Sequence, residues 1–254
     1  MKKIKNLLLG SAASLVLVAG ISQAEMRIGI DPAPYLPFSA ESASGNLEGW
    51  EIEIAEAICA AMNEDCVWVK TAWDGLIPAL TSNKVDAIIN SMSITEERMK
   101  TIDFSNKYYN TPAVIVAPKE SNISADAASV SGMIVGVQVA TTHANYVEAH
   151  MGSATVKSYQ NFDEHNQDLF AGRLDAVIGD SMAMQPFLQS NEGQCCEIKG
   201  DLHDVSIFGP GVGVGLRKGS DLKAKINAAI DQIRADGTFD KISAPYFNFD
   251  IYGG

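Results

Sequence analysis

The sequence predicts an α/β protein with two lobes, each a mixed sheet flanked by helices, joined by a hinge of two strands. Three observations predict this fold. Strand-like and helix-like segments alternate along the chain, which is typical of α/β architecture. One segment recurs in the second half, and 254 residues suit two units better than one small domain.

The first residues have the pattern of a secretory signal peptide. Lysines precede an apolar run from Leu7 to Ile21, and small residues at Ser22 and Ala24 suit cleavage after Ala24. The run is shorter than the ~20 apolar residues of a membrane-spanning helix. We therefore expect residues 1–24 to be removed and the exported mature chain to be free and soluble.

The charge balance excludes some partners. The formal net charge is −12, and the leader carries bases but no acids, so the mature chain is more negative still. Such a charge repels nucleic acids and anionic membranes. It also favours solubility, and it favours cationic ligands weakly.

Four cysteines in an exported chain suggest disulfides. Cys59 and Cys66 flank the end of a predicted helix, Trp50–Met62, and the start of a predicted strand, Val67–Lys70. We expect these two to pair.

Cys195 and Cys196 are adjacent in the sequence. They could form a vicinal disulfide, stay reduced or pair between molecules, and their spacing does not distinguish these possibilities. No histidine accompanies the cysteines at a spacing that suits zinc. We expect no metal site and no cofactor.

Further elements follow from periodicity. Met26–Asp31 is a short apolar strand, and Trp50–Met62 has the apolar spacing of an amphipathic helix. We expect a solvated face to carry its acidic residues Glu51, Glu53 and Glu56.

A pseudo-repeat relates the two halves of the chain. Leu80–Ser91 aligns without a gap with Leu169–Asp180, each a helix end, a basic turn and a buried strand with small or polar last residues. Met26–Asp31 and Met133–Thr142 form a second related pair. Ligands of open α/β sheets bind beyond the carboxyl ends of the strands. Two facing units would surround one cleft with Asp31, Asn90, Ser91, Thr141, Thr142 and Asp180.

The lobe boundaries follow from the same pattern. Tyr109–Pro112 is predicted to be the first crossing between lobes and Phe208–Gly211 the return, with a final helix over Asp221–Asp236. Two crossing strands form a hinge. The expected division is residues 25–110 plus 211–254 for the first lobe and 111–210 for the second.

Over nearly the whole mature chain, the sequence resembles the family 3 periplasmic solute-binding proteins for polar amino acids, especially the lysine/arginine/ornithine, histidine and opine group. The matching segments are Gly49–Ala55, Trp73–Leu80, Asp86–Thr95, Gly172–Val177 and Phe249–Gly253, with Asp163–Leu169 closest to opine-binding members. The resemblance implies the type II periplasmic binding protein fold, periplasmic location and the Cys59–Cys66 disulfide. It also implies delivery of a free amino acid to the permease of an ABC importer. We expect a monomer.

The resemblance assigns the carboxylate of the ligand to Arg98 and to the backbone N–H of Thr142. Ser93 with Glu96 has the form of a capping box, which would place Arg98 beside N–H groups at a helix start that attract anions. A guanidinium can grip a carboxylate through two parallel hydrogen bonds. From spacing alone, Arg98 could instead be an exposed residue paired with a neighbouring glutamate.

The other ligand groups also have candidates. The resemblance assigns the α-ammonium to Asp180, helped by Ser91, although Asp180 could simply close a turn. Asp31, Tyr35 and Trp73 lie where members that bind cationic ligands have an acid and two aromatics. Asp31 could instead form a turn, and Trp73 could belong to the core.

Three departures concern the pocket for the ligand side chain. Pro32–Pro34 contains one extra residue before Tyr35, Asn90 replaces a common Ser and His143 a common Gln. His143 could contact the polar end of the ligand or cap its helix. The sequence therefore leaves arginine, lysine, ornithine, histidine and opines open.

Two alternatives share the scaffold. Cyclohexadienyl and arogenate dehydratases resemble these binding proteins, and Asp31 or His143 could be a general acid. No nucleophile–base pair supports that reading, so no residue is predicted to be catalytic. A ligand-sensing domain would use the same closure.

Overall fold

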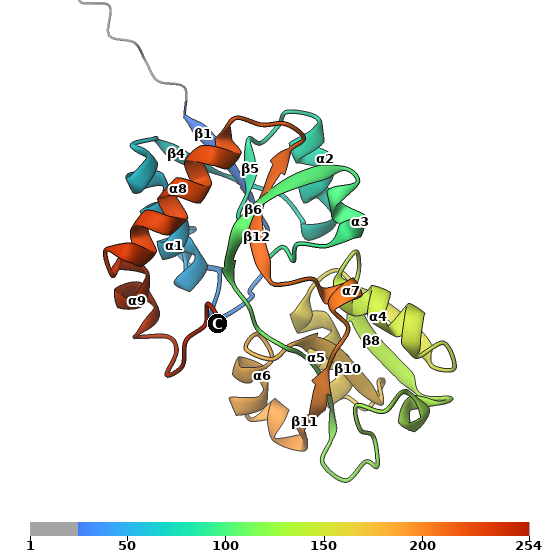
Figure 1. Ribbon diagram of the computed structural model, residues 1–254. Helices are drawn as coiled ribbons and strands as arrows, with labels where there is room; N and C mark the ends of the chain where they lie inside the picture. The colour runs from blue at the N-terminus through green and yellow to red at the C-terminus, as the bar shows by residue number, and fades with distance from the viewer. Residues whose placement is uncertain (1–24, 254) are drawn as a thin grey trace, which may run out of the picture.

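The structure, a computed structural model, describes residues 25–253. These residues form two five-stranded sheets and a short two-stranded one. Each large sheet is flanked by helices, and the two lobes lie end to end (Figure 1). This confirms the predicted two-lobed α/β fold. The predicted signal peptide, residues 1–24, lies outside the described residues.

The first lobe contains the sheet with strand order β4-β1-β5-β12-β6. Strand β1 runs parallel to β4 and β5, whereas β12 runs antiparallel to β5 and β6. The strands are β1 (Met26–Ile30), β4 (Cys66–Lys70), β5 (Ala87–Ile88), β6 (Ile102–Tyr109) and β12 (Val212–Arg217), with the separate hairpin β2 (Ala40–Glu41) and β3 (Leu47–Glu48). The helices are α1 (Trp50–Met62), the 3-10 turn η1 (Trp73–Gly75), α2 (Leu76–Thr81), α3 (Glu96–Met99), α8 (Leu222–Ala235) and α9 (Thr238–Ser243).

The second lobe contains the sheet with strand order β11-β7-β10-β8-β9. Strand β8 runs parallel to β9 and β10, and β7 runs antiparallel to β10 and β11. The strands are β7 (Ala113–Pro118), β8 (Ile134–Gln138), β9 (Thr155–Tyr159), β10 (Ala176–Asp180) and β11 (Cys196–Leu202). The helices are η2 (Ala127–Val130), α4 (Thr142–His150), α5 (Phe162–Phe170), α6 (Gln185–Gln189), η3 (Glu192–Cys195) and α7 (Val205–Phe208).

The pseudo-repeat is confirmed by equivalent contacts in the two lobes. The carboxylate of Asp86 accepts a hydrogen bond from the backbone N–H of Arg27 at 3.1 Å. Asp175, its partner in the alignment, accepts one from the backbone N–H of Ile134 at 2.7 Å. In both lobes an acid before the central strand thus ties that strand to the parallel strand beside it, β1 in the first lobe and β8 in the second. The aligned ends of the repeat, Ser91 and Asp180, therefore occupy corresponding places.

The predicted elements agree closely with the structure. Helix α1 has the predicted bounds, and α8 lies inside the predicted Asp221–Asp236. Trp50, at the start of α1, is fully buried, and its indole N–H donates to the hydroxyl of Ser243 at 2.9 Å, which ties α1 to α9.

Two short segments cross between the lobes. Strand β6 ends at Tyr109 and β7 begins at Ala113, and the chain returns from α7 to β12 through Gly209–Gly211. Gly209 has φ +74°, and a Cβ there would lie 1.8 Å from the carbonyl oxygen of Ile94. Only glycine permits this close approach of the return crossing to the first lobe.

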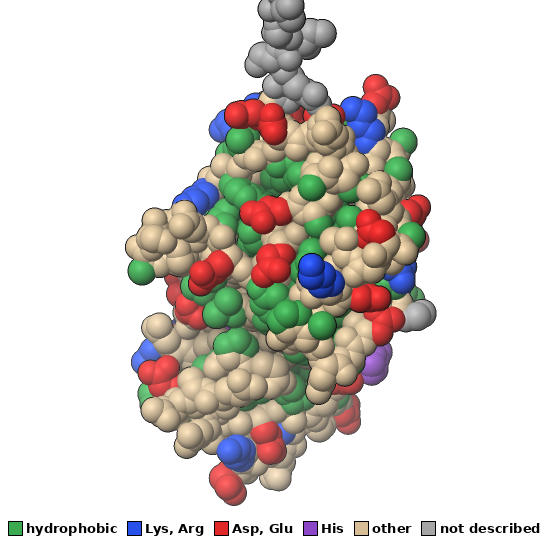
Figure 2. Space-filling model, turned by 90° about the vertical axis from the view of Figure 1, so that its left-hand side faces the viewer, with side chains coloured by type: hydrophobic (Ala, Val, Ile, Leu, Met, Phe, Trp, Pro, Cys, Tyr) green, Lys and Arg blue, Asp and Glu red, His purple; other side chains and the backbone are tan. Residues whose placement is uncertain are grey.

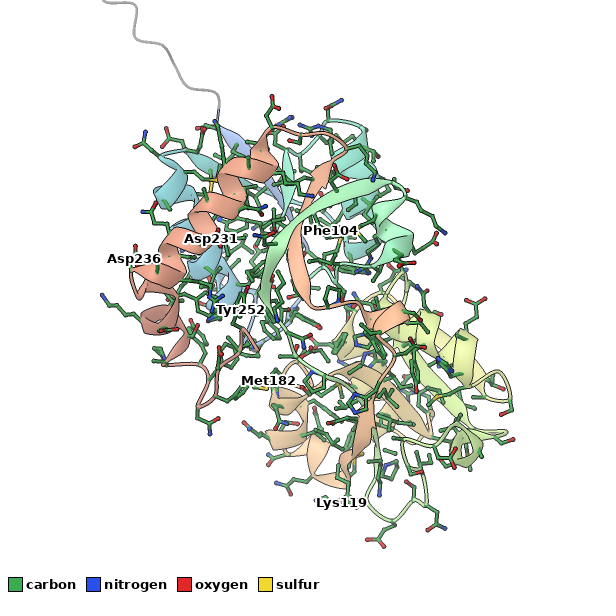
Figure 3. The ribbon with its side chains drawn as sticks, viewed as in Figure 1. Phe104, Lys119, Met182, Asp231, Asp236 and Tyr252 are labelled. Atoms are coloured by element: carbon green, nitrogen blue, oxygen red, sulfur yellow. A yellow bond between two sulfur atoms is a disulfide. The ribbon has the colours of Figure 1, made fainter. Side chains whose placement is uncertain are left out.

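The last described residues pack on the first crossing. The backbone N–H of Asn110 donates to the carbonyl of Ile251 at 2.9 Å, and the ammonium of Lys107 to the carbonyl of Gly253 at 2.8 Å. Between Ile251 and Gly253, the ring centre of Tyr252 lies 3.2 Å from the guanidinium carbon of Arg234. Tyr252 thus lies close to the junction of the lobes, far from Lys119 at the outer end of the second lobe (Figure 3).

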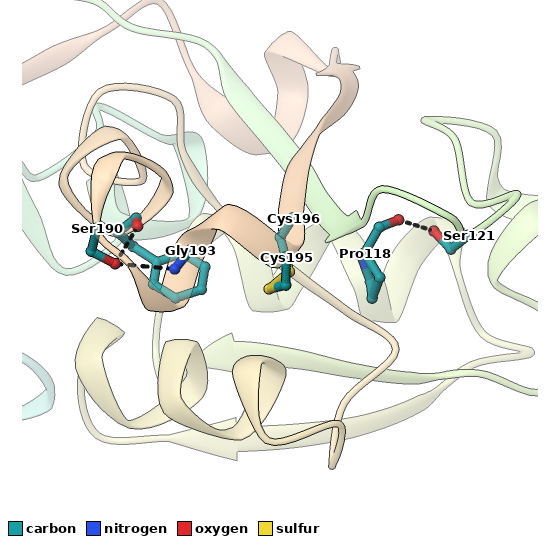
Figure 4. The surroundings of a disulfide bond; sticks show 7 residues. Pro118, Ser121, Ser190, Gly193, Cys195 and Cys196 are labelled. Carbon is teal, nitrogen blue, oxygen red and sulfur yellow. Dashed lines mark hydrogen bonds between the residues drawn. A yellow bond between two sulfur atoms is a disulfide. The ribbon is translucent and has the colours of Figure 1, made fainter.

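Both cysteine pairs form disulfides, and none of the cysteines in residues 25–253 is free. Cys59–Cys66 is confirmed and joins the end of α1 to the start of β4. Of the three possibilities for Cys195 and Cys196, the structure has the vicinal disulfide. It lies where β11 begins, beside Pro118 at the end of β7 (Figure 4).

Asp and Glu side chains are scattered over the face shown in Figure 2 rather than gathered in one patch. Within residues 25–253, none of the helices has the length and apolar character needed to span a bilayer.

Candidate functional site

A cavity of about 850 Å³, including the solvent space at its mouth, lies between the two lobes. Both lobes and both crossings line it. Every residue predicted to bind a ligand is among the lining residues: Asp31, Tyr35, Trp73, Asn90, Ser91, Ser93, Arg98, Thr141, Thr142, His143 and Asp180. The structure therefore brings the whole predicted set together, and its binding role remains a prediction.

Strand direction explains this convergence. Asp31 follows β1 and Ser91 closely follows β5, two parallel strands of the first lobe. In the second lobe, Thr141 follows β8 and Asp180 ends β10, again parallel strands. The carboxyl ends of both sets meet at the cavity, which is the usual ligand position in open α/β sheets.

Arg98 extends into the cavity from α3. Its guanidinium donates to the carbonyl of Ser93 at 3.0 Å and to the carbonyl of Ala140, in the second lobe, at 3.3 Å. Among residues 25–253, the salt bridges include none to Arg98. Burial of the uncompensated guanidinium lowers the pKa of Arg98 to about 10, so the group stays cationic at neutral pH.

The predicted capping box at Ser93 and Glu96 is wrong. The N-cap of α3 is Thr95, whose hydroxyl accepts from the backbone N–H of Arg98 at 3.2 Å. Ser93 forms an isolated bridge with Val212, the first residue of β12. Its backbone is therefore extended and paired, and cannot begin the helix.

The second lobe presents a helix start to the same cavity. Thr141 is the N-cap of α4, with its hydroxyl accepting from the backbone N–H of Ala144 at 3.1 Å. Thr142 is the first residue of this nine-residue helix and is buried. Backbone N–H groups in the first turn have no helical partner and favour anions. A carboxylate near Arg98 could therefore be held from both lobes.

Asp180 is both a turn residue and a cavity residue. One carboxylate oxygen accepts from the backbone N–H groups of Met182 at 2.8 Å and Ala183 at 3.1 Å. The other accepts from the hydroxyl of Thr111, on the first crossing. Burial raises the pKa of Asp180 to about 6, although the hydrogen bonds from these neutral donors lower it. A cation beside it would favour the charged form.

Asp31 is held in the same manner. It accepts from the backbone N–H of Ala33 at 3.0 Å and from that of Trp73 at 3.1 Å. Burial raises the pKa of Asp31. Its partners in the protein are again neutral donors, although the carboxylate lies at the cavity wall.

The two predicted aromatics differ in their surroundings. Tyr35 packs its ring edge to face on Phe162 of the second lobe, with ring centres 4.9 Å apart. Trp73 lies beside Arg98, at 5.3 Å from the ring centre to the guanidinium carbon. The indole N–H of Trp73 donates to the carbonyl of Ala140 at 3.2 Å, so Trp73 contacts both lobes.

His143 and Asn90 are the unusual cavity residues. His143 does not cap α4, because Thr141 does. It is buried, and burial lowers its pKa to about 4, so the imidazole is neutral at pH 7. Its Nδ1 has no hydrogen-bond partner within the described protein. The amide oxygen of Asn90 accepts from the backbone N–H of Asp31.

The sequence prediction for Glu51 is wrong. Glu53 and Glu56 are exposed as expected, but Glu51 is completely buried. It accepts hydrogen bonds from the backbone N–H and the hydroxyl of Ser91. A signal was present, because helical spacing places position 51 on the same face as the buried Ala55 and Ile58.

Thr111 is a further residue missed from the sequence. It lines the cavity and contacts Asp180. Its position in a crossing segment carried no periodic pattern by which it could be found.

The geometry defines a class of protein: a two-lobed α/β receptor that holds a small polar ligand between its lobes. A family model describing bacterial extracellular solute-binding proteins, family 3, matches residues 26–249. The chain belongs to this family.

Relatives and a solved structure agree with this assignment. An L-arginine-binding protein of Pseudomonas aeruginosa (strain PAO1) is 43% identical over 260 residues, covering 100% of this chain and 99% of that protein. A histidine-binding periplasmic protein of Salmonella typhimurium (strain LT2) is 38% identical over 262 residues, covering both chains completely. An ancestral arginine-binding protein bound to arginine superposes with a TM-score of 0.81 at 34% identity, covering 88% of this chain and 98% of that one. These relatives are binding proteins and not enzymes.

Proposed function

We propose that this protein captures a cationic amino acid, or an opine derived from one, in the periplasm by closing its lobes. It would then deliver the ligand to the permease of an ABC importer. One observation carries the ligand class: the cavity between the lobes holds an unpaired guanidinium, that of Arg98, and two carboxylates, Asp31 and Asp180, that are bonded only to neutral donors.

The ligand would lie with its α-carboxylate between Arg98 and the start of α4. Its α-ammonium would contact Asp180 and Ser91. A cationic side chain would extend toward Asp31, beside Trp73, because cations are stabilised by carboxylates and by aromatic faces. The carboxylate and the ammonium would each be held by both lobes, which favours closure when the ligand binds.

Several features belong to the same proposal. The signal peptide would be cleaved after Ala24, and the mature protein would act as a monomer without cofactor or enzymatic activity. The lobes, residues 25–110 plus 211–254 and residues 111–210, would move about the two crossings.

A thermal-shift screen tests the ligand class. The panel contains arginine, lysine, ornithine, histidine, glutamine, glutamate, octopine and nopaline. At about 100 times Kd a ligand stabilises the folded state by ~2.7 kcal/mol, or roughly 5–10 °C for a chain of this size. We expect this rise with a basic amino acid or an opine. A response confined to glutamate or glutamine would contradict the cationic pocket.

The same protein tests the enzymatic alternative. Incubation with prephenate or arogenate should give no product. Turnover would contradict the binding-only role.

A further inference from the structure

Glu51 lies behind the cavity rather than in it. It is the second residue of α1, and its side chain is completely buried. Ser91 is among the described residues that line the cavity, and Glu51 is not. Any effect of Glu51 on a ligand must therefore pass through a neighbour or through its charge.

The carboxylate of Glu51 accepts hydrogen bonds from both donors of Ser91. One carboxylate oxygen accepts from the backbone N–H of Ser91 at 2.6 Å, and the other from its hydroxyl at 2.8 Å. A serine that has given away both protons retains only acceptors, namely its carbonyl oxygen and the lone pairs of its hydroxyl. An ammonium group has donors only, so the two are complementary.

The backbone of Ser91 is also unusual. Its φ of +51° lies in the left-handed region, which non-glycine residues rarely adopt. The two hydrogen bonds to Glu51 hold the residue in this conformation, directly after the strand end that reaches the cavity.

The charge of Glu51 is supported locally. The hydroxyl of the buried Tyr108 also donates to it, so all three partners are donors, as an ionised carboxylate requires. Among residues 25–253, no cation forms a salt bridge with Glu51. Its place in the first turn of α1 favours a negative charge.

We propose that Glu51 is a positioning residue: it makes Ser91 an acceptor for the α-ammonium group of the ligand and so favours α-amino acids over α-hydroxy acids. This inference rests on the proposed function.

The test compares the dissociation constants of L-arginine and argininic acid, in which a hydroxyl replaces the α-ammonium. Glu51→Gln introduces an amide that can donate to the Ser91 hydroxyl, whose proton then turns to the cavity. That proton opposes an ammonium but can be donated to a hydroxyl. We expect the preference for L-arginine to fall by about tenfold or more. The matched control Glu53→Gln, an exposed position on the same helix, should leave the preference unchanged.

A double-mutant cycle separates positioning from a long-range effect of charge. Ser91→Gly removes the hydroxyl and tolerates the positive φ. In that background Glu51→Gln should no longer alter the preference. An equal loss in both backgrounds would show that Glu51 acts through its charge, and would overturn the proposal.

Three further outcomes decide the inference. An unchanged preference in a folded Glu51→Gln protein overturns the inference. If that variant does not fold, Glu51→Asp replaces it: the charge is kept, but the shorter side chain reaches one Ser91 donor at most. The preference should again fall, and an unchanged value overturns the inference. If the wild type binds none of arginine, lysine, ornithine and histidine, this inference fails, and if it also binds neither octopine nor nopaline, the proposed function fails with it.

Discussion

Within residues 25–253, the charged side chains of the cavity have no charged partners. Arg98 donates only to backbone carbonyls, and Asp180 accepts only from neutral donors. Burial shifts both pKa values toward the neutral forms. A zwitterionic ligand supplies both missing charges, which explains why an amino acid fits this cavity better than a neutral molecule does.

Arg98 can be tested directly. Arg98→Ala should weaken L-arginine binding by about 100-fold or more, because the ligand carboxylate loses a desolvated charged partner. Arg98→Lys keeps the charge but loses the planar guanidinium that forms two parallel hydrogen bonds, so its affinity for L-arginine should fall by about tenfold. Isothermal titration calorimetry measures both, with the thermal midpoint of the ligand-free variants as the control for folding. Near-wild-type affinity in Arg98→Ala would refute the carboxylate contact.

The affinity should depend on pH through Asp180. In the ligand-free protein burial raises the pKa of Asp180 to about 6, and a bound ammonium would lower it again. Binding below pH 6 must therefore release a proton. Affinity for L-arginine should be level above about pH 7 and should decrease as pH falls through 6, by at most about tenfold per pH unit.

Two comparisons isolate this effect. His143, with its pKa lowered to about 4, does not titrate in the same range. Asp180→Asn should bind weakly at every pH and without this slope. A wild-type affinity that stayed constant down to pH 5 would show that the Asp180 carboxylate does not contact the ligand.

Asp31, Ser91 and Asp180 can be assigned to one cleft from the sequence alone, through the repeat and the strand ends. This is possible because strand direction and alternation are local properties of the sequence. Glu51 and Thr111 were missed, since their roles depend on the partner that the fold brings to them. A buried acidic residue on a helix is predicted to be solvent-exposed unless one checks whether it shares a helical face with apolar residues.

At the scale of single elements, the start of α1 determines where Glu51 lies behind the cavity. Gly49 precedes the helix with φ +121°, and a Cβ there would lie 2.5 Å from the carbonyl oxygen of Phe38. The backbone N–H of Glu51 donates to that same carbonyl at 2.9 Å. Gly49 therefore sets the start of the helix and, with it, the position of Glu51.

Gly49→Ala should lower the free energy of unfolding by about 2 kcal/mol, from an unfavourable φ and a close contact. The thermal midpoint should fall by roughly 4–8 °C. Gly45→Ala is the matched control. Its φ is also positive, at +84°, but the nearest atom to an added Cβ is a Glu41 side-chain oxygen at 3.6 Å. Equal losses in the two variants would show that the contact with Phe38 contributes nothing.

Element bounds were well predicted where packing and local pattern agree, as in α1 and α8. The start of α3 was not. Ser93 and Glu96 fit a capping box, but Val212, at the start of β12 and far along the chain, pairs with Ser93. Because this long-range contact holds Ser93 in an extended conformation, the helix begins later and Thr95 is its N-cap.

At the scale of the whole molecule, two hydrogen bonds between the lobes converge on one carbonyl group. The oxygen of Ala140, in the second lobe, accepts from Trp73 and from Arg98 of the first. Ala140 itself has φ +55°. Because few hydrogen bonds between described residues join the lobes across the cavity, we expect the lobes to exchange between open and closed forms, and a ligand to shift that balance.

Trp73→Phe tests this contact. It keeps an aromatic face but removes the indole N–H, so the ligand-free protein should shift toward the open form. The radius of gyration from small-angle X-ray scattering should increase, and L-arginine affinity should fall by about two- to tenfold. Trp68→Phe, the same change in β4 of the same lobe, is the control. An unaltered radius in Trp73→Phe would mean that the Ala140 contact does not hold the lobes together.

The insertion of β12 between β5 and β6 has a consequence for the order in which the molecule forms during synthesis. The sheet of the second lobe is complete once Leu202 has emerged, whereas the first sheet must wait for Arg217 at the end of β12. Pairing over such sequence distances is slow. The part of the chain made first therefore finishes folding last, and a nascent chain stopped near Leu202 would contain a finished second lobe beside an open first sheet.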